Sequence, residues 1–373
     1  MSIRKSLLFV LFSIAMLGAA APCAQAAGLP IVVGQAIDLS GPNGSIGRDY
    51  VAGISTYFDS LNAKGGINGR KIAYVVNDDR GLPAESARIV SGLIKDGRAD
   101  YLLGAIGADA TQATLAAPVF AASRHTLFAP LATAPDSAQP RVLYWRPSIE
   151  SEFLFLLVYF ERLGIKDIGI ALQESAQNNK SFQFLTAQMR KRRLNLAGVV
   201  RLSGNAAALK TDTQRLSTAG AKLIITIGDT VASAQFLNAF RRHDPSTFVA
   251  GTSLTNLTTL GEIAGARATE FTVFSQVVPN PAGTVSVLQA EHVAMMKRFR
   301  DEPVSSVTLE GFAVAKTLVR MMRVDAAGKS RAVAAQSAPM DLGGMVVGAA
   351  AGANTLSRYV DIAAFQRGGG LMF

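Results

Sequence analysis

Short runs of apolar, mostly β-branched residues alternate along the chain with segments in which apolar residues recur every three or four positions. The first pair is an apolar run at 31–33 followed by Val51, Ile54, Phe58 and Leu61. This spacing predicts a strand at 31–33 and then a helix with one buried face.

The alternation continues and falls into two successive sets. The first set predicts strands at 72–76, 101–106 and 126–129 and helices at 83–95 and 111–122. The second begins beyond Arg146 and Pro147, with helices at 152–163, 178–192, 210–219 and 231–242 and strands at 167–172, 198–202, 222–227 and 247–250. Strands that alternate with helices are typical of a parallel sheet covered on both faces. The pattern therefore predicts an α/β fold with two doubly wound parallel sheets.

The N-terminus has the order of a secretory signal peptide. Arg4 and Lys5 precede an apolar run at 7–21, and the small-residue segment 24–26 follows it. We expect cleavage after Ala26 and, because no later stretch is long and uncharged enough to span a bilayer, a soluble mature chain. An alternative is lipidation of Cys23, the single cysteine, although the residues before it fit a lipobox poorly. Cleavage after Ala26 would leave no cysteine for disulfides, nucleophilic catalysis or metal binding.

Length and charge narrow the class of protein. Removal of 1–26 from the 373 residues leaves more chain than one core normally holds, so two domains are expected. Apolar residues make up 49% and charged residues 17%, which excludes a disordered chain. The net charge of +10 could favour an anionic partner. However, the densest basic run, 190–193, ends a predicted helix, and a secretory signal also argues against a nucleic-acid partner.

Several sequence blocks, in order along almost the whole mature chain, carry a family resemblance. The segments 38–42, 61–71 and 77–79 resemble the first lobe of the leucine/isoleucine/valine-binding family of ABC-importer receptors. Phe128 to Pro135 is similar to that family's ligand loop, 275–281 to its lobe-crossing strand, and 358–362 to its closing block. Each block is weak alone, and their order makes the match specific.

The resemblance implies a type I periplasmic-binding fold, with two lobes joined by three crossovers and a ligand cleft between them. We expect crossovers near 146–147, 278–279 and 338. The first lobe would then comprise 27–146 and 279–337, and the second 147–278 and 338–373. The implied function is a periplasmic receptor that delivers a small polar ligand, such as an amino acid or amide, to the membrane permease of an ABC importer. A monomer is expected, and a ligand sensor of the same fold that acts on a regulatory partner is the alternative.

The family's amino-acid site carries over to this chain only in part. Ala132 and Thr133 stand where the family's loop holds the ligand carboxylate and amine. Elsewhere the family's residues are replaced. Ala108 stands in place of a serine, and Ser253 in place of the acid that pairs with the ligand ammonium. The family's three tyrosines are replaced by Ile46, by Gln177 or its neighbour Ala176, and by Asp229. The amino-acid signature is therefore largely missing, and the solute stays open among amino acids, amides, polyols and aromatic acids.

Two acids, Asp109 and Asp229, stand in loops that the fold would place at the cleft rim. A carboxylate desolvated by closure would suit a ligand with an ammonium, amide or several hydroxyls. Both acids are also placed to cap the helices that follow them, and the two roles can coexist. Thr111 and Thr230 carry the same two interpretations.

Catalytic motifs are weak. The glycines of 41–47 lack dinucleotide-binding spacing, and Gly328-Lys329-Ser330 lacks the leading glycine and strand of a P-loop. The three histidines are scattered without a partner at metal spacing. The sequence thus predicts a binding protein without catalytic residues, cofactor or metal.

Overall fold

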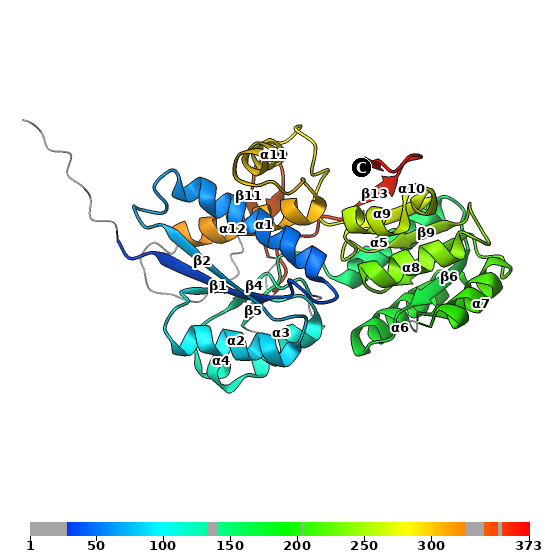
Figure 1. The fold of residues 1–373 in the computed structure, drawn as a ribbon, viewed down its shortest axis with the longest axis horizontal. Helices are drawn as coiled ribbons and strands as arrows, with labels where there is room; N and C mark the ends of the chain where they lie inside the picture. The colour runs from blue at the N-terminus through cyan, green and yellow to red at the C-terminus, as the bar shows by residue number, and fades with distance from the viewer. Residues whose placement is uncertain (1–27, 133–140, 203–204, 325–338, 350–352) are drawn as a thin grey trace, which may run out of the picture.

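The computed structural model describes residues 28–132, 141–202, 205–324, 339–349 and 353–373. These residues form two α/β lobes that lie side by side (Figure 1). The signal peptide predicted at 1–26, Thr133 and Ala338 lie outside the described residues.

The first lobe is built on a five-stranded parallel sheet in the order β2-β1-β3-β4-β5. Helices α1, α11 and α12 cover one face, and α2, α3 and α4 cover the other (Figure 1). The elements of this lobe are β1 (Ile31–Ile37), α1 (Gly44–Asn62), β2 (Ile72–Asp78), α2 (Pro83–Lys95), β3 (Tyr101–Leu103), α3 (Ala108–Ala116), α4 (Pro118–Ala122), β4 (Leu127–Phe128), β5 (Val142–Leu143), α11 (Val287–Phe299), α12 (Ser306–Val324), β11 (Met340–Asp341) and β12 (Val346–Val347).

The second lobe contains a seven-stranded sheet in the order β14-β13-β10-β9-β8-β6-β7. Strands β6 to β10 are parallel, whereas β13 runs antiparallel to β10 and β14 antiparallel to β13. Its elements are α5 (Ile149–Arg162), β6 (Asp167–Leu172), α6 (Ala176–Lys191), β7 (Asn195–Arg201), α7 (Ala206–Ser217), β8 (Leu223–Ile227), α8 (Thr230–Phe240), β9 (Phe248–Gly251), α9 (Leu257–Ala264), α10 (Ala266–Thr269), β10 (Thr272–Gln276), β13 (Asp361–Phe365) and β14 (Leu371–Met372).

Burial of apolar residues on both faces of each sheet explains why these segments fold as they do. In the second lobe, α5 and α6 pack over one apolar cluster with β6 and β8, and α7, α8 and α9 pack over another. All five residues of β8 are buried, as expected for a central strand covered on both sides. The prediction of doubly wound α/β sheets is confirmed.

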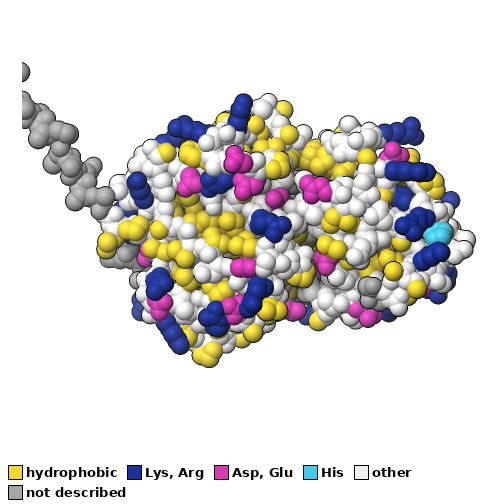
Figure 2. Space-filling model, viewed as in Figure 1, with side chains coloured by type: hydrophobic (Ala, Val, Ile, Leu, Met, Phe, Trp, Pro, Cys, Tyr) yellow, Lys and Arg dark blue, Asp and Glu magenta, His cyan; other side chains and the backbone are white. Residues whose placement is uncertain are grey.

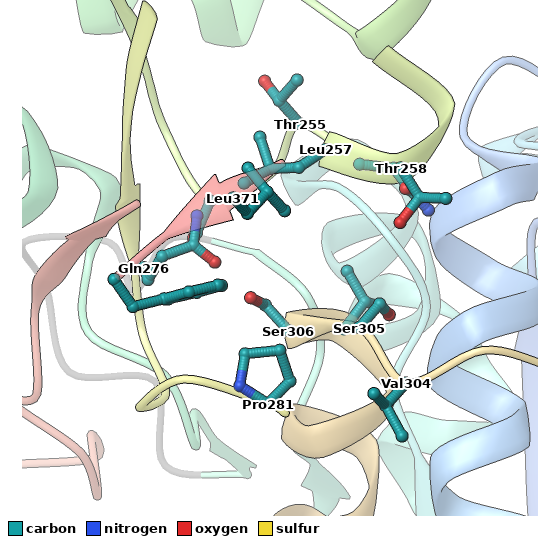
Figure 3. A pocket seen from close by; sticks show the side chains of 13 residues that line it. Thr255, Leu257, Thr258, Gln276, Pro281, Val304, Ser305, Ser306 and Leu371 are labelled. Carbon is teal, nitrogen blue, oxygen red and sulfur yellow. The ribbon is translucent and has the colours of Figure 1, made fainter. Parts of the chain in front are cut away.

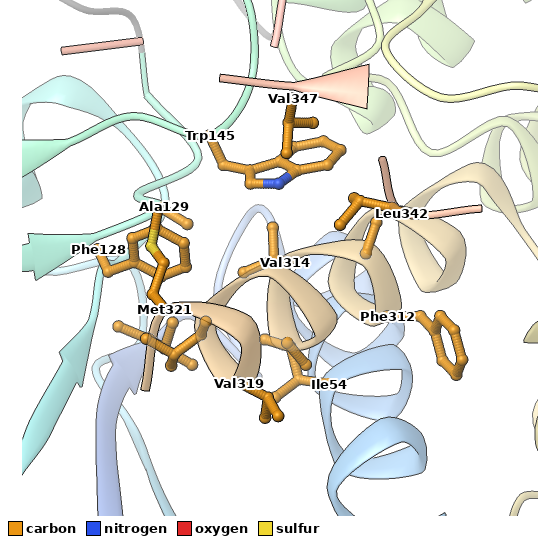
Figure 4. Packing of buried hydrophobic residues seen from close by; sticks show 14 of the residues in the cluster. Ile54, Phe128, Ala129, Trp145, Phe312, Val314, Val319, Met321, Leu342 and Val347 are labelled. Atoms are coloured by element: carbon orange, nitrogen blue, oxygen red, sulfur yellow. The ribbon is translucent and has the colours of Figure 1, made fainter. Parts of the chain in front are cut away.

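Helix α12 forms the centre of the first-lobe core (Figure 4). Phe312 and Val314 are fully buried there, and Trp145, at the end of the first lobe, donates its indole N–H to Thr317 Oγ1 over 2.9 Å. Contact between α1 and α12 needs glycine at two points. A Cβ on Gly53 would lie 2.0 Å from the carbonyl oxygen of Thr308, and one on Gly311 would lie 2.2 Å from that of Tyr50.

The chain passes between the lobes at Arg146–Ile149 and again after β10. Its third passage differs from the expectation. Met340, Leu342, Met345 and Val347 pack in the first-lobe core, and the chain joins the second sheet only at β13. The described residues 339–356, which we expected in the second lobe, therefore belong to the first, because their apolar side chains fill the space beside α12.

Candidate functional site

A cavity of about 40 Å³ lies between the lobes and is lined from both (Figure 3). The second lobe supplies the loop between β9 and α9, the end of β10 and the β14 segment, and the first supplies the start of α12. Seven lining side chains carry a hydroxyl or amide, namely Ser253, Thr255, Asn256, Thr258, Gln276, Ser305 and Ser306; the other six are Leu257, Pro281, Val304, Val307, Leu371 and Phe373. The cavity has room for only a few water-sized groups, so a larger ligand needs the lobes to separate.

The amide of Gln276 and the hydroxyl of Ser306 come from different lobes and border the same space (Figure 3). Gln276 is the last residue of β10 and is 1% exposed. Ser306 is the first residue of α12. A solute held here would therefore contact both lobes at once.

Asp49 of α1 connects the lobes at the edge of this cavity. Its Oδ2 accepts hydrogen bonds from Ser305 Oγ at 2.8 Å and from Asn256 Nδ2, in the second lobe, at 3.2 Å. Burial raises the pKa of the Asp49 carboxyl, while these two hydrogen bonds act in the opposite direction. Asn256 and Ser305 also accept hydrogen bonds from backbone N–H groups at the starts of α9 and α12.

A second group of polar contacts crosses between the lobes at the first passage. The Arg146 guanidinium lies 3.5 Å from Glu310 of α12 and 3.9 Å from Glu152 of α5, and all three side chains are almost completely buried. Arg146 also donates to Ser253 Oγ. Glu152 accepts from the backbone N–H of Ser253 and from the Ser275 hydroxyl. Burial raises the pKa of Glu310 to about 7, with Arg146 lowering and Glu152 raising it.

The structure shows that one of the two acids caps a helix and that the other does not. Asp229 is the N-cap of α8: its Oδ1 accepts from Ala232 N at 2.7 Å and its Oδ2 from Gln173 Nε2 at 2.7 Å. Asp109 is not a cap, because Gly107 at φ +94° takes that position and leaves Asp109 exposed in the first turn of α3.

The threonines have local partners. Thr111 is buried and donates back to the carbonyl oxygen of Gly107 at 2.9 Å. Thr230 is buried and accepts from Asn256 N at 3.0 Å, so it holds the loop that lines the cavity. Both hydroxyls therefore support loops in this structure.

The remaining predicted residues are dispersed. Ser253 lines the cavity, whereas Ile46 and Ala132 are buried in separate apolar clusters of the first lobe. Ala108 and Gln177 are half-buried in the first turns of α3 and α6. Sequence reasoning did not select Gln276, Ser305 or Ser306. Gln276 falls in the block similar to the family's crossing strand, and this was the available signal.

Surface charge, possible metal ligands and helix length in the described residues point to no additional site. Basic and acidic side chains are interspersed over the face of both lobes seen in Figure 2. In the described ranges, no three His, Cys, Asp or Glu side chains come together as metal ligands. Among the helices described, none combines the length and apolar character needed to cross a membrane.

In the part of the chain that the structure describes, two α/β lobes, the passages of the chain between them and a cavity at their junction define a two-lobed ligand-binding protein of the periplasmic type. The periplasmic binding protein family model matches residues 30–358, and the chain belongs to this family. It is accordingly a binding protein and not an enzyme.

Solved structures share the fold. An extracellular ligand-binding receptor from Verminephrobacter eiseniae superposes with a TM-score of 0.83 at 20% identity, over 92% of this chain and 100% of the other. A substrate-binding periplasmic protein from Ralstonia solanacearum gives 0.82 at 24% identity, over 92% and 99%.

Curated relatives match over shorter segments. An amino acid binding protein of Pseudomonas aeruginosa is 35% identical over 74 residues, 20% of each chain. The substrate-binding protein BasB of a chemotactic signal transduction system in Halobacterium salinarum is 32% identical over 114 residues, 30% of this chain and 27% of its own. The chain thus aligns with less than a third of the length of these relatives.

Proposed function

We propose that the protein is a periplasmic receptor that captures a small polar solute between its lobes and delivers it to the permease of an ABC importer. The observation that carries the proposal is the interlobe cavity, because both lobes contribute hydroxyl or amide groups to its lining. A solute that contacts both lobes stabilises their closed arrangement, and a closed receptor presents a surface that an open one lacks. Export through a signal peptide cleaved after Ala26 is part of this proposal.

A sensor is the second candidate. The relative from Halobacterium salinarum is named as part of a chemotactic system, and the same lobe closure would serve a signalling partner. Both functions would use the same ligand. They differ in the partner protein that binds the closed receptor, which is a permease in one case and a signalling protein in the other.

The test begins with mature protein, residues 27–373, refolded after removal of any bound ligand. Fractions of a metabolite extract are screened by thermal shift, because a ligand that binds only the folded state raises the melting temperature. Small-angle scattering then asks whether an active fraction compacts the molecule. A receptor gives both responses, and the absence of either response in every fraction would contradict the proposal.

A deletion strain separates importer from sensor. Loss of uptake of the identified solute, restored by the wild-type gene, supports delivery to an importer. Normal uptake together with a lost behavioural or transcriptional response to the same solute would support the sensor.

A further inference from the structure

The lining of the interlobe cavity combines hydroxyl and amide groups with a larger apolar surface and carries no charged side chain. Its hydroxyl and amide groups can donate and accept, and Phe373 and Val304 add apolar surface. Gln276 and Ser305 are 1% and 9% exposed, so a ligand that reached them would be largely removed from water. A charged group desolvated there would need a countercharge or several strong hydrogen bonds.

Asp49, the acid beside the cavity, already accepts hydrogen bonds from two side chains of the cavity lining. Two helices, α9 and α12, begin at the lining, and their N-termini would favour an anion. Asp49 already places a carboxylate between Asn256 and Ser305, the residues that accept hydrogen bonds at these two helix starts. The protein therefore provides the anion for this location from its own chain.

The buried charges at the first passage also offer no countercharge. Arg146 is shared by Glu152 and Glu310, so the three groups together carry one negative charge when Glu310 is ionised and none when it is protonated. None of the three lines the cavity. Although Arg146 Nε and Nη1 have no hydrogen-bond partner among the described residues, a ligand carboxylate would meet two protein carboxylates around the same guanidinium.

Asp229 also accepts hydrogen bonds from within the protein. One of its carboxylate oxygens accepts from the start of α8 and the other from Gln173. A ligand ammonium at either oxygen would share it with a donor of the protein.

From these contacts we infer that the ligand of the interlobe cavity is uncharged and bears amide or hydroxyl groups beside an apolar part. Gln276, whose Nε2 also donates to the carbonyl oxygen of Ser275, and Ser306 are the residues that recognise it, one from each lobe. The inference rests on the proposed receptor function and specifies its substrate class.

The test compares four probes that share one branched tail and differ in charge: 3-methylbutanamide, 3-methylbutanoate, 3-methylbutylammonium and leucine. Erythritol adds an uncharged hydroxyl probe. Binding to the ligand-stripped mature protein is measured by titration calorimetry and thermal shift. We expect binding of at least one uncharged probe, weakened about tenfold by Ser306→Ala or Gln276→Leu through loss of one hydrogen bond.

Ser217→Ala and Gln183→Leu are the matched controls, because both residues lie on second-lobe helices outside the cavity lining. They should leave affinity unchanged. Tighter binding of leucine or of either ion than of the amide would overturn the inference, and so would the absence of binding by both uncharged probes. If the extract screen yields a charged ligand, the receptor function stands and only the uncharged class is refuted.

Discussion

Replacement of Glu310 with glutamine isolates the effect of one buried carboxyl on stability. Glu310 is 4% exposed and faces Arg146 and Glu152, with Tyr50 also near enough to interact electrostatically. Burial, the largest cause, raises its pKa from 4.5 to about 7. A pKa difference of this size between the folded and unfolded states corresponds to a free-energy difference of about 3 kcal/mol.

The sign follows from the proton that each state holds. Between pH 4.5 and 7 the folded protein keeps a proton on Glu310 that the unfolded chain has lost. The stability contribution of Glu310 is therefore fully present below pH 4.5 and is lost as the pH rises towards 7 and above. Glutamine is neutral at every pH and resembles the protonated acid. Relative to wild type, the free energy of unfolding of Glu310→Gln should increase by about 3 kcal/mol between pH 4 and pH 8.

Urea denaturation at several pH values measures this difference, and taking the difference from wild type cancels the titrating groups that do not interact with Glu310. Glu262→Gln, at an exposed position in α9, is the control and should follow wild type at all pH values. Parallel wild-type and Glu310→Gln curves between pH 4 and 8 would refute the reasoning.

Three further predictions concern other parts of the molecule. Burial lowers the pKa of His292 to about 4, so the free energy of unfolding should fall by about 3 kcal/mol as the pH drops from 6.5 to 4. Urea denaturation of His292→Gln over this pH range should lack this fall. An equal fall in wild type and variant would contradict the prediction. Asp229→Ala should lower the free energy of unfolding by about 1 to 2 kcal/mol through loss of the cap and the Gln173 contact. It should leave calorimetric ligand affinity unchanged, whereas a large affinity loss would place Asp229 at the ligand. Phe312→Ala should lower the free energy of unfolding by about 3 to 5 kcal/mol because the side chain is fully buried beside α1, and a change near zero would be inconsistent with that burial.

The sheets were predictable because their signal is local. A buried strand such as β8 and an amphipathic helix such as α1 can each be read from a few consecutive residues. The third passage was not predictable in this way. The apolar residues at 340, 342, 345 and 347 indicate burial, but the sequence does not say which of the two cores contains them.

The candidate site was predictable only in part for a related reason. Ser253 was selected from the family's pattern, whereas Gln276 and Ser306 meet only because β10 and α12 come together at the junction of the lobes. The capping interpretation held for Asp229 and was wrong for Asp109. A glycine two residues earlier, with positive φ, takes the cap position at α3, and residue preferences alone did not reveal it.

Ser253 links the sequence departures to the proposed ligand. The family resemblance implies an acid at this position that pairs with a ligand ammonium, and here the serine instead receives a hydrogen bond from Arg146. An acid in place of Ser253 would bring a third carboxylate to a guanidinium that Glu152 and Glu310 already share. The positive charge of Arg146 is thus balanced within the protein, by Glu152 of one lobe and Glu310 of the other. With serine at this position, no side chain of the cavity lining can pair with a ligand ammonium, and this supports the uncharged ligand inferred above.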